Sequence, residues 1–134
     1  MDEVLKFLKD NQIFYLATVD GNVPKVRPFG FVMNYEGKLY FCTSNQKDVF
    51  KQLQINPHFE VSTTSQTGEW LRLKGEAVFN TNKQSKQAAL AAAPMLSKMY
   101  KVDDSIFELF YINNAEATFR DMKGKDQTIK FSAD

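Results

Sequence analysis

The sequence predicts a mainly β fold of the α+β class, an antiparallel barrel with flanking helices. Strand-like runs follow one another along the chain, and most neighbouring runs are separated by short hairpin signals. Helical patterns are few and are inserted between these runs. The chain has 134 residues, of which 43% are hydrophobic, so residues 1–134 are expected to form a single domain.

The first part of the chain predicts a helix followed by three strands. Residues 2–11 have the pattern of a short amphipathic helix, whose apolar side is expected to cover the sheet. The strands are expected at 13–19, 23–33 and 38–43, joined by turns at Asp20-Gly21-Asn22 and Glu36-Gly37.

The remaining elements are predicted by the same signals. A helix is expected from Asp48 to Asn56-Pro57, with Thr43, Ser44 and Asn45 as candidates for its N-cap. A hairpin is expected at 58–64 and 69–80, followed by a helix at 83–100 that Pro94 breaks or restarts. Two strands are expected at 105–113 and 116–122, and a short tail strand ends near 131.

The composition excludes several classes of function. Lys and Arg total 17 against 16 Asp and Glu, so no overall basic field predicts nucleic-acid binding. Cys42 is the single cysteine and His58 the single histidine, which excludes an internal disulfide and argues against a metal site rich in these ligands. The acidic start of the chain and the absence of a long apolar run predict a cytoplasmic protein with no membrane association.

Lys47 is the first residue that does not suit its predicted surroundings. Asp48 suits the first turn of its helix, because the unpaired N–H groups there favour negative charge. A cation at the same place is unfavourable unless it points into solvent or an anion binds beside it. Arg27 lies on a strand face that is otherwise largely apolar at its far end, and Pro28 predicts that regular strand pairing stops there. Spacing alone leaves two interpretations open, a phosphate site and two solvated side chains.

The ordered set of motifs along the chain resembles the pyridoxamine 5'-phosphate oxidase-like family of FMN-binding split barrels. The motifs are Ala17-Thr18-Val19-Asp20-Gly21, Val26-Arg27-Pro28-Phe29, Gly37-Lys38-Leu39-Tyr40-Phe41, Lys47 with Leu53 and Asn56-Pro57, and Trp70-Leu71-Arg72-Leu73-Lys74-Gly75-Glu76-Ala77. The resemblance covers most of the chain. It implies a small split barrel that forms a homodimer, with two FMN sites at the subunit interface.

The resemblance also implies which residues hold the cofactor. Arg27 and Lys47 match the family's basic contacts to the FMN phosphate, and Pro28 and Phe29 match the strand along the flavin. Cys42 and Thr43 match the strand end beside the cofactor, and Ser44 and Asn45 match the loop around the phosphate. Trp70 matches a residue that reaches the flavin of the partner subunit. For Trp70, plain packing in the core or interface is an equal alternative.

The sequence departs from the true pyridoxamine phosphate oxidases in its tail. Residues 113–134 contain no Trp or His and Arg120 is their only arginine, so oxidation of pyridoxamine phosphate is not expected. His58 is interpreted as a surface or capping residue and Cys42 as packing, so no protein residue is assigned to catalysis.

The resemblance is closest to short members grouped with nitroimidazole-resistance proteins. It implies an FMN-dependent oxidoreductase that passes electrons from a nicotinamide nucleotide to a small acceptor. A flavin- or haem-binding storage or sensor module is the alternative, and a deazaflavin-dependent reductase is a third possibility without a dedicated sequence feature.

Overall fold

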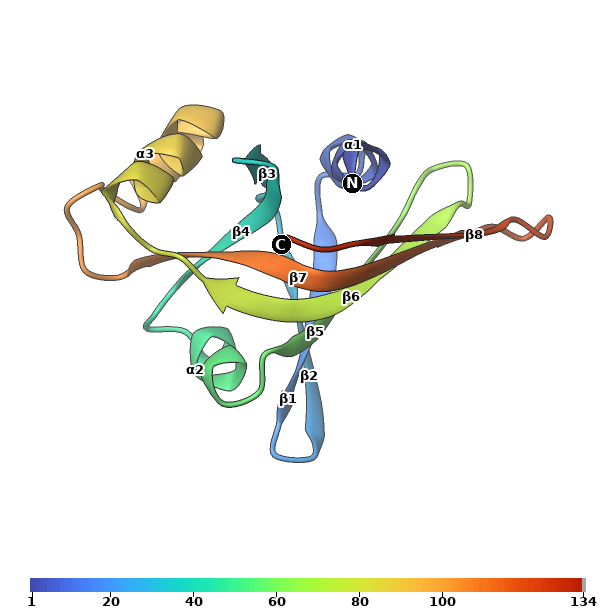
Figure 1. Ribbon diagram of the computed structural model, residues 1–134, viewed down its shortest axis with the longest axis horizontal. Helices are drawn as coiled ribbons and strands as arrows, with labels where there is room; N and C mark the ends of the chain where they lie inside the picture. The colour runs from blue at the N-terminus through green and yellow to red at the C-terminus, as the bar shows by residue number, and fades with distance from the viewer. Residues whose placement is uncertain (134) are drawn as a thin grey trace.

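The computed structural model describes residues 1–133 as one open antiparallel sheet with helices at its margins (Figure 1). The strands run in the order β2-β1-β5-β6-β7-β4-β3, and β8 pairs with β7. Their bounds are β1 (Phe14–Asp20), β2 (Val23–Phe29), β3 (Met33–Tyr35), β4 (Lys38–Ser44), β5 (His58–Thr64), β6 (Trp70–Phe79), β7 (Phe107–Arg120) and β8 (Asp126–Phe131). The helices are α1 (Asp2–Asp10), α2 (Asp48–Ile55), α3 (Lys83–Ala92) and the short 3-10 helix η1 (Pro94–Lys98).

The predicted antiparallel α+β fold is confirmed, with the qualification that the sheet is not closed. Within the described residues β2 pairs only with β1, and β3 only with β4. β2 is an edge strand, so no neighbouring strand on its outer side requires the N–H groups that Pro24 and Pro28 lack. The helices of the described chain are too short or too polar to cross a membrane.

Two predicted strand boundaries were wrong. Residues 23–33 do not form one strand: β2 ends at Phe29, where its partner Phe14 is the first residue of β1, and the chain then turns to pair β3 with β4. The two last strands predicted before the tail are a single strand, β7. The predicted break at Asn114-Ala115 is a β-bulge in which Asn114 has a φ of 51°, a conformation that asparagine tolerates better than most residues.

The long strand β7 organises the sheet. Its first half pairs with β4, its second half with β8, and nearly its whole length with β6 on the other side. The main core includes residues of β4 and β7, where Phe41 stacks on Phe110 with ring centroids 5.5 Å apart. Helix α1 covers the same core with Val4 and Leu8, which are fully buried.

A second cluster of buried residues fixes the segment around η1. Tyr100 stacks on Phe107 with ring centroids 4.4 Å apart, and Leu96 packs in the same cluster as Tyr40. The break predicted at Pro94 is confirmed, because α3 ends at Ala92 and η1 begins at Pro94. This packing brings η1, which follows α3 at one end of the molecule (Figure 1), close to the end of β4.

The start of α2 differs from the prediction. None of Thr43, Ser44 and Asn45 is the N-cap; that position is Lys47, and no side chain caps the helix. Asp48 occupies the first turn as expected. The first N–H groups of α2 therefore lack the side-chain acceptor that usually satisfies them.

Candidate functional site

A cavity of about 380 Å3 lies where the ends of β2 and β4 and the start of α2 meet the segment around η1. Six of the nine residues that the sequence assigned to the cofactor line it: Arg27, Pro28, Phe29, Cys42, Thr43 and Lys47. Its volume falls within the range of small-molecule sites, about 300–1,000 Å3. The described residues of its lining include two cations and no Asp, Glu or His, so its charge suits an anionic ligand.

The Arg27 side chain is held in place by acceptors from β1 and α2. Its Nη1 donates to the carbonyl oxygen of Leu16 at 3.2 Å and to Oγ1 of Thr18 at 2.8 Å. Its Nη2 donates to Oε1 of Gln52 at 2.7 Å. Partial burial lowers the pKa of Arg27, while the negative charge of Asp48 acts in the opposite direction. The guanidinium stays charged at neutral pH, because arginine does not deprotonate in this range.

Two polar groups at the cavity lack partners. Oγ1 of Thr43 is buried and has no hydrogen-bond partner, the only such side-chain atom in residues 1–133. Leaving a buried hydroxyl unpaired costs about 1–3 kcal/mol, so a ligand atom at this place is favoured. Lys47 is exposed, and its ammonium makes no hydrogen bond or ion pair with the described residues. The ammonium of Lys47 can therefore meet an incoming anion directly, whereas Oγ1 of Thr43 is covered and needs a small local movement to do so.

Cys42 lines the same cavity but is not activated. Burial raises the pKa of its thiol to about 12, although the positive charge of Lys47 acts to lower it. The thiolate is the reactive form of cysteine, so this thiol is a poor nucleophile at physiological pH. The interpretation of Cys42 as a packing residue agrees with this environment.

The opposite wall of the cavity was not found from the sequence. It consists mainly of apolar residues around η1, namely Ala93, Met95, Leu96, Met99 and Tyr100, with Phe31 beside them. Met95 and Met99 remain 74% and 64% exposed, so their flexible side chains border the opening. The only local signal was the cluster of apolar residues after Pro94, and it carries no information about which strand it contacts.

The other three predicted site residues lie outside this cavity. Ser44 is buried, and the Asn45 side chain donates to Oε2 of Glu108 at 2.8 Å, which ties the loop to β7. Trp70 is half-buried at the first position of β6, where it pairs with Thr64. Trp70 therefore does not line this cavity within one chain.

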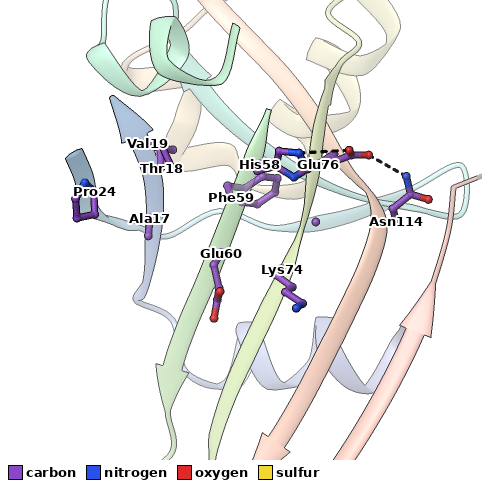
Figure 2. A pocket seen from close by; sticks show the side chains of 11 residues that line it. Ala17, Thr18, Val19, Pro24, His58, Phe59, Glu60, Lys74, Glu76 and Asn114 are labelled. Atoms are coloured by element: carbon purple, nitrogen blue, oxygen red, sulfur yellow. Dashed lines mark hydrogen bonds and ion pairs between the residues drawn. The ribbon is translucent and has the colours of Figure 1, made fainter. Parts of the chain in front are cut away.

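A second cavity, of about 530 Å3, lies on the face formed by β1, β5 and β6 (Figure 2). Figure 2 shows His58, Glu76 and Asn114 in a row along one side of it. Nε2 of His58 lies 3.7 Å from Oε1 of Glu76, and Nδ2 of Asn114 donates to Oε2 at 2.8 Å. These polar groups pair with one another, and the His58 side chain is 69% exposed. The prediction of a surface histidine is confirmed, and the smaller cavity remains the better candidate for an anionic cofactor.

Comparison with known proteins gives the same relationship as the sequence motifs. The family model described as "Pyridoxamine 5'-phosphate oxidase" matches residues 1–121. A nimC/nimA family protein from Clostridium acetobutylicum has 44% sequence identity and a TM-score of 0.95, over 98% of this chain and 92% of that chain. No curated protein matches the sequence significantly.

More distant solved structures share the fold. General Stress Protein 26 from Bacillus anthracis str. Sterne has 15% identity and a TM-score of 0.76, over 96% of this chain and 97% of that chain. A haem-binding protein from Mycobacterium smegmatis has 15% identity and a TM-score of 0.70, over 90% of this chain and 53% of that chain. The family match and the 44% identical relative together establish that this chain belongs to the pyridoxamine 5'-phosphate oxidase family.

Proposed function

We propose that the protein binds FMN in the cavity between β2, β4, α2 and η1, with the FMN phosphate beside Arg27 and Lys47. The observation that carries this proposal is the unpaired, buried hydroxyl of Thr43 in a cavity that holds two cations and no acid. A phosphate accepts hydrogen bonds from hydroxyl, ammonium and guanidinium groups. The uncapped N-terminus of α2 adds N–H groups that favour an anion at the same place.

The apolar part of the cavity suits a planar ring. Pro28, Phe29, Phe31 and Tyr100 line it, and the exposed methionines border its opening. FMN, when bound, supplies the redox chemistry, and this chain supplies binding and orientation. Because no Asp, Glu or His of the described chain lines the cavity, no side chain there is suited to move a proton at neutral pH. We therefore propose an FMN-dependent oxidoreductase that passes electrons from a nicotinamide nucleotide to a small acceptor.

The purified protein is expected to bind FMN and to accept electrons from NADH or NADPH. Each nucleotide would be added without oxygen while flavin absorbance is followed, and oxygen, free flavin or a nitroaromatic compound would then be added separately. Bleaching by a nucleotide and recovery with an acceptor are the expected results. Pyridoxamine 5'-phosphate is expected to give little or no turnover, because residues 113–134 lack the Trp and His of the true oxidases.

Other outcomes of this experiment distinguish the alternatives. Bound FMN that neither nucleotide reduces would support a storage or sensor module. A haem spectrum in the purified protein, or preference for a deazaflavin over FMN, would replace the proposed cofactor. Rapid formation of pyridoxal phosphate would show that the tail is compatible with the oxidase reaction after all.

We also propose that the protein is a homodimer with the flavin sites at the interface. The outer face of β1 and β2 carries large exposed apolar side chains: Val26 is 68% exposed and Tyr15 53%. The register pairs Tyr15 with Pro28 and Ala17 with Val26, so these residues share one face. The apolar band continues into the second cavity through Ala17. A patch of this kind on one face is typical of a protein–protein contact.

Substitution of Val26 by Lys is expected to convert the dimer to a monomer. A lysine at the centre of the apolar band would place a charge in the interface, whereas in the monomer it would be solvated and would leave the fold unchanged. Light scattering at micromolar concentration measures the assembly, with Lys25→Glu as a matched control on the other face of β2. A wild-type monomer that binds FMN would contradict the shared-site model and remove Trp70 from the site.

A further inference from the structure

Arg27 is held by two residues that the sequence did not connect with the site. Gln52 lies on α2 and Thr18 on β1, and neither lines the cavity. Oγ1 of Thr18 donates to Oε1 of Gln52 at 2.5 Å, and the guanidinium donates to both of these oxygens. We propose that Gln52 and Thr18 are positioning residues, which fix Arg27 so that one edge of its guanidinium is presented to a phosphate monoester. This inference rests on the proposed FMN site and assigns the group that orients its arginine.

One edge of the Arg27 guanidinium remains available to a ligand. Arginine has five N–H donors: one on Nε and two on each Nη. Nη1 donates to Leu16 and Thr18, and Nη2 donates once, to Gln52. At least two donors, Nε–H and one Nη2–H, therefore have no acceptor among the described residues.

The two available donors form a fork. Because Thr18 and Gln52 accept from Nη1 and Nη2 respectively and their oxygens lie 2.5 Å apart, they occupy the edge between the two Nη atoms. The remaining Nη2–H then lies on the side of Nε, parallel to Nε–H. Parallel N–H groups of this kind bind two oxygens of a phosphate or carboxylate at once.

The charges around Arg27 fit this role. Its three acceptors are a carbonyl, a hydroxyl and an amide, which are neutral, so the guanidinium keeps its net positive charge for a ligand. The acid that acts on it is Asp48, and it acts through space without a hydrogen bond to Arg27. A glutamate at position 52 would accept the same hydrogen bonds but would neutralise the cation.

Gln52→Leu is expected to lower the affinity for FMN about tenfold, the effect of one hydrogen bond to a charged group, and to leave the affinity for riboflavin unchanged. Riboflavin has the same ring but no phosphate, so an effect confined to FMN locates the change at the phosphate. Gln54→Leu is the matched control, because Gln54 is exposed on the same helix and is not among the hydrogen-bond acceptors of Arg27. The thermal unfolding temperature of each variant shows whether the fold is retained.

Gln52→Glu separates charge from geometry. The carboxylate still holds the guanidinium, so the fold is expected to be at least as stable as that of the wild type, while FMN affinity falls and riboflavin affinity does not. Unchanged FMN affinity in Gln52→Glu would show that neutralising Arg27 does not affect the phosphate, which would contradict the proposal. Equal loss of FMN and riboflavin affinity in Gln52→Leu, or unchanged FMN affinity in both variants, would overturn the proposal.

An NMR measurement tests the positioning role of Gln52 without requiring that the cofactor be FMN. The N–H signals of a fixed guanidinium are individually resolved, and those of a freely rotating one are averaged. Resolved Arg27 signals that shift with inorganic phosphate in the wild type, and are averaged in Gln52→Leu, would support the positioning role even if FMN did not bind. Arg27 signals that are equally resolved in the variant would exclude the role, whether or not FMN binds.

Discussion

Replacing Lys47 with glutamate is expected to weaken FMN binding by about 100-fold or more while the fold stays intact. The substitution changes the charge beside the proposed phosphate by two units, and a phosphate monoester carries about −1.5 to −2 at neutral pH. Even at the dielectric of water, charges about 4 Å apart interact by about 1 kcal/mol per pair, so the total change is about 3 kcal/mol. Isothermal titration with FMN measures the loss, and circular dichroism checks the fold.

Lys51→Glu is the matched control for this variant. Lys51 is exposed on the same helix, one turn later, and does not line the cavity. Its FMN affinity is expected to fall less than that of Lys47→Glu, because Lys51 is exposed and does not line the cavity, so its charge acts from a greater distance. Equal losses in both variants would show a general effect of charge, and no loss in Lys47→Glu would return Lys47 to the role of a solvated side chain.

Arg27→Glu is a less informative variant than Lys47→Glu, although the sequence assigns both residues to the phosphate. Its partners Leu16, Thr18 and Gln52 present oxygen acceptors. A glutamate at position 27 would face these acceptors with a carboxylate, and buried acceptors without donors are costly. Loss of FMN binding in Arg27→Glu would therefore combine the loss of a ligand contact with damage to the junction of β1, β2 and α2.

Gly75→Ala is expected to destabilise the protein by about 3 kcal/mol, at the upper end of the cost of overpacking. A Cβ at position 75 would lie 2.6 Å from Cγ1 of Ile112 and 2.7 Å from the carbonyl oxygen of Asn113. Ile112 is buried and the carbonyl of Asn113 belongs to the backbone of β7, so neither atom can move without disturbing the pairing of β6 with β7. Thermal and urea unfolding measure the change.

Gly30→Ala is the control for this prediction. Gly30 borders the cavity, and a Cβ added there would meet, beyond its chain neighbours, only the carbonyl oxygen of Gln12, at 3.8 Å, which is ordinary contact. Alanine there is expected to be neutral or to stabilise by up to about 1 kcal/mol, because it restricts the unfolded chain. Similar stability of the two variants would mean that the close approach at Gly75 is relieved by a small backbone shift.

Local signals in the sequence determined most of the elements. The hairpin between β1 and β2 follows from Asp20-Gly21-Asn22, and α2 ends at Ile55, before Asn56-Pro57, as predicted. Such features depend on φ and ψ preferences of a few consecutive residues, which a sequence displays directly. The boundaries that failed, after Phe29 and at Asn114, depend on which strand lies alongside, and the local residues do not encode that.

Part of the candidate site could likewise be predicted from the sequence, and the rest depended on the tertiary structure. The order of motifs along the sequence was enough to assign Arg27, Lys47 and Thr43 to one site, and the structure places all three on one cavity. Only the tertiary structure brought the wall around η1 to that cavity, about 50 residues further along the chain, and joined Gln52 to Arg27. Leu96 and Tyr100 pack in one cluster with Tyr40, and Gln52 of α2 accepts a hydrogen bond from Arg27 of β2. These are long-range contacts whose free energy depends on partners distant in sequence, so no local pattern can reveal them.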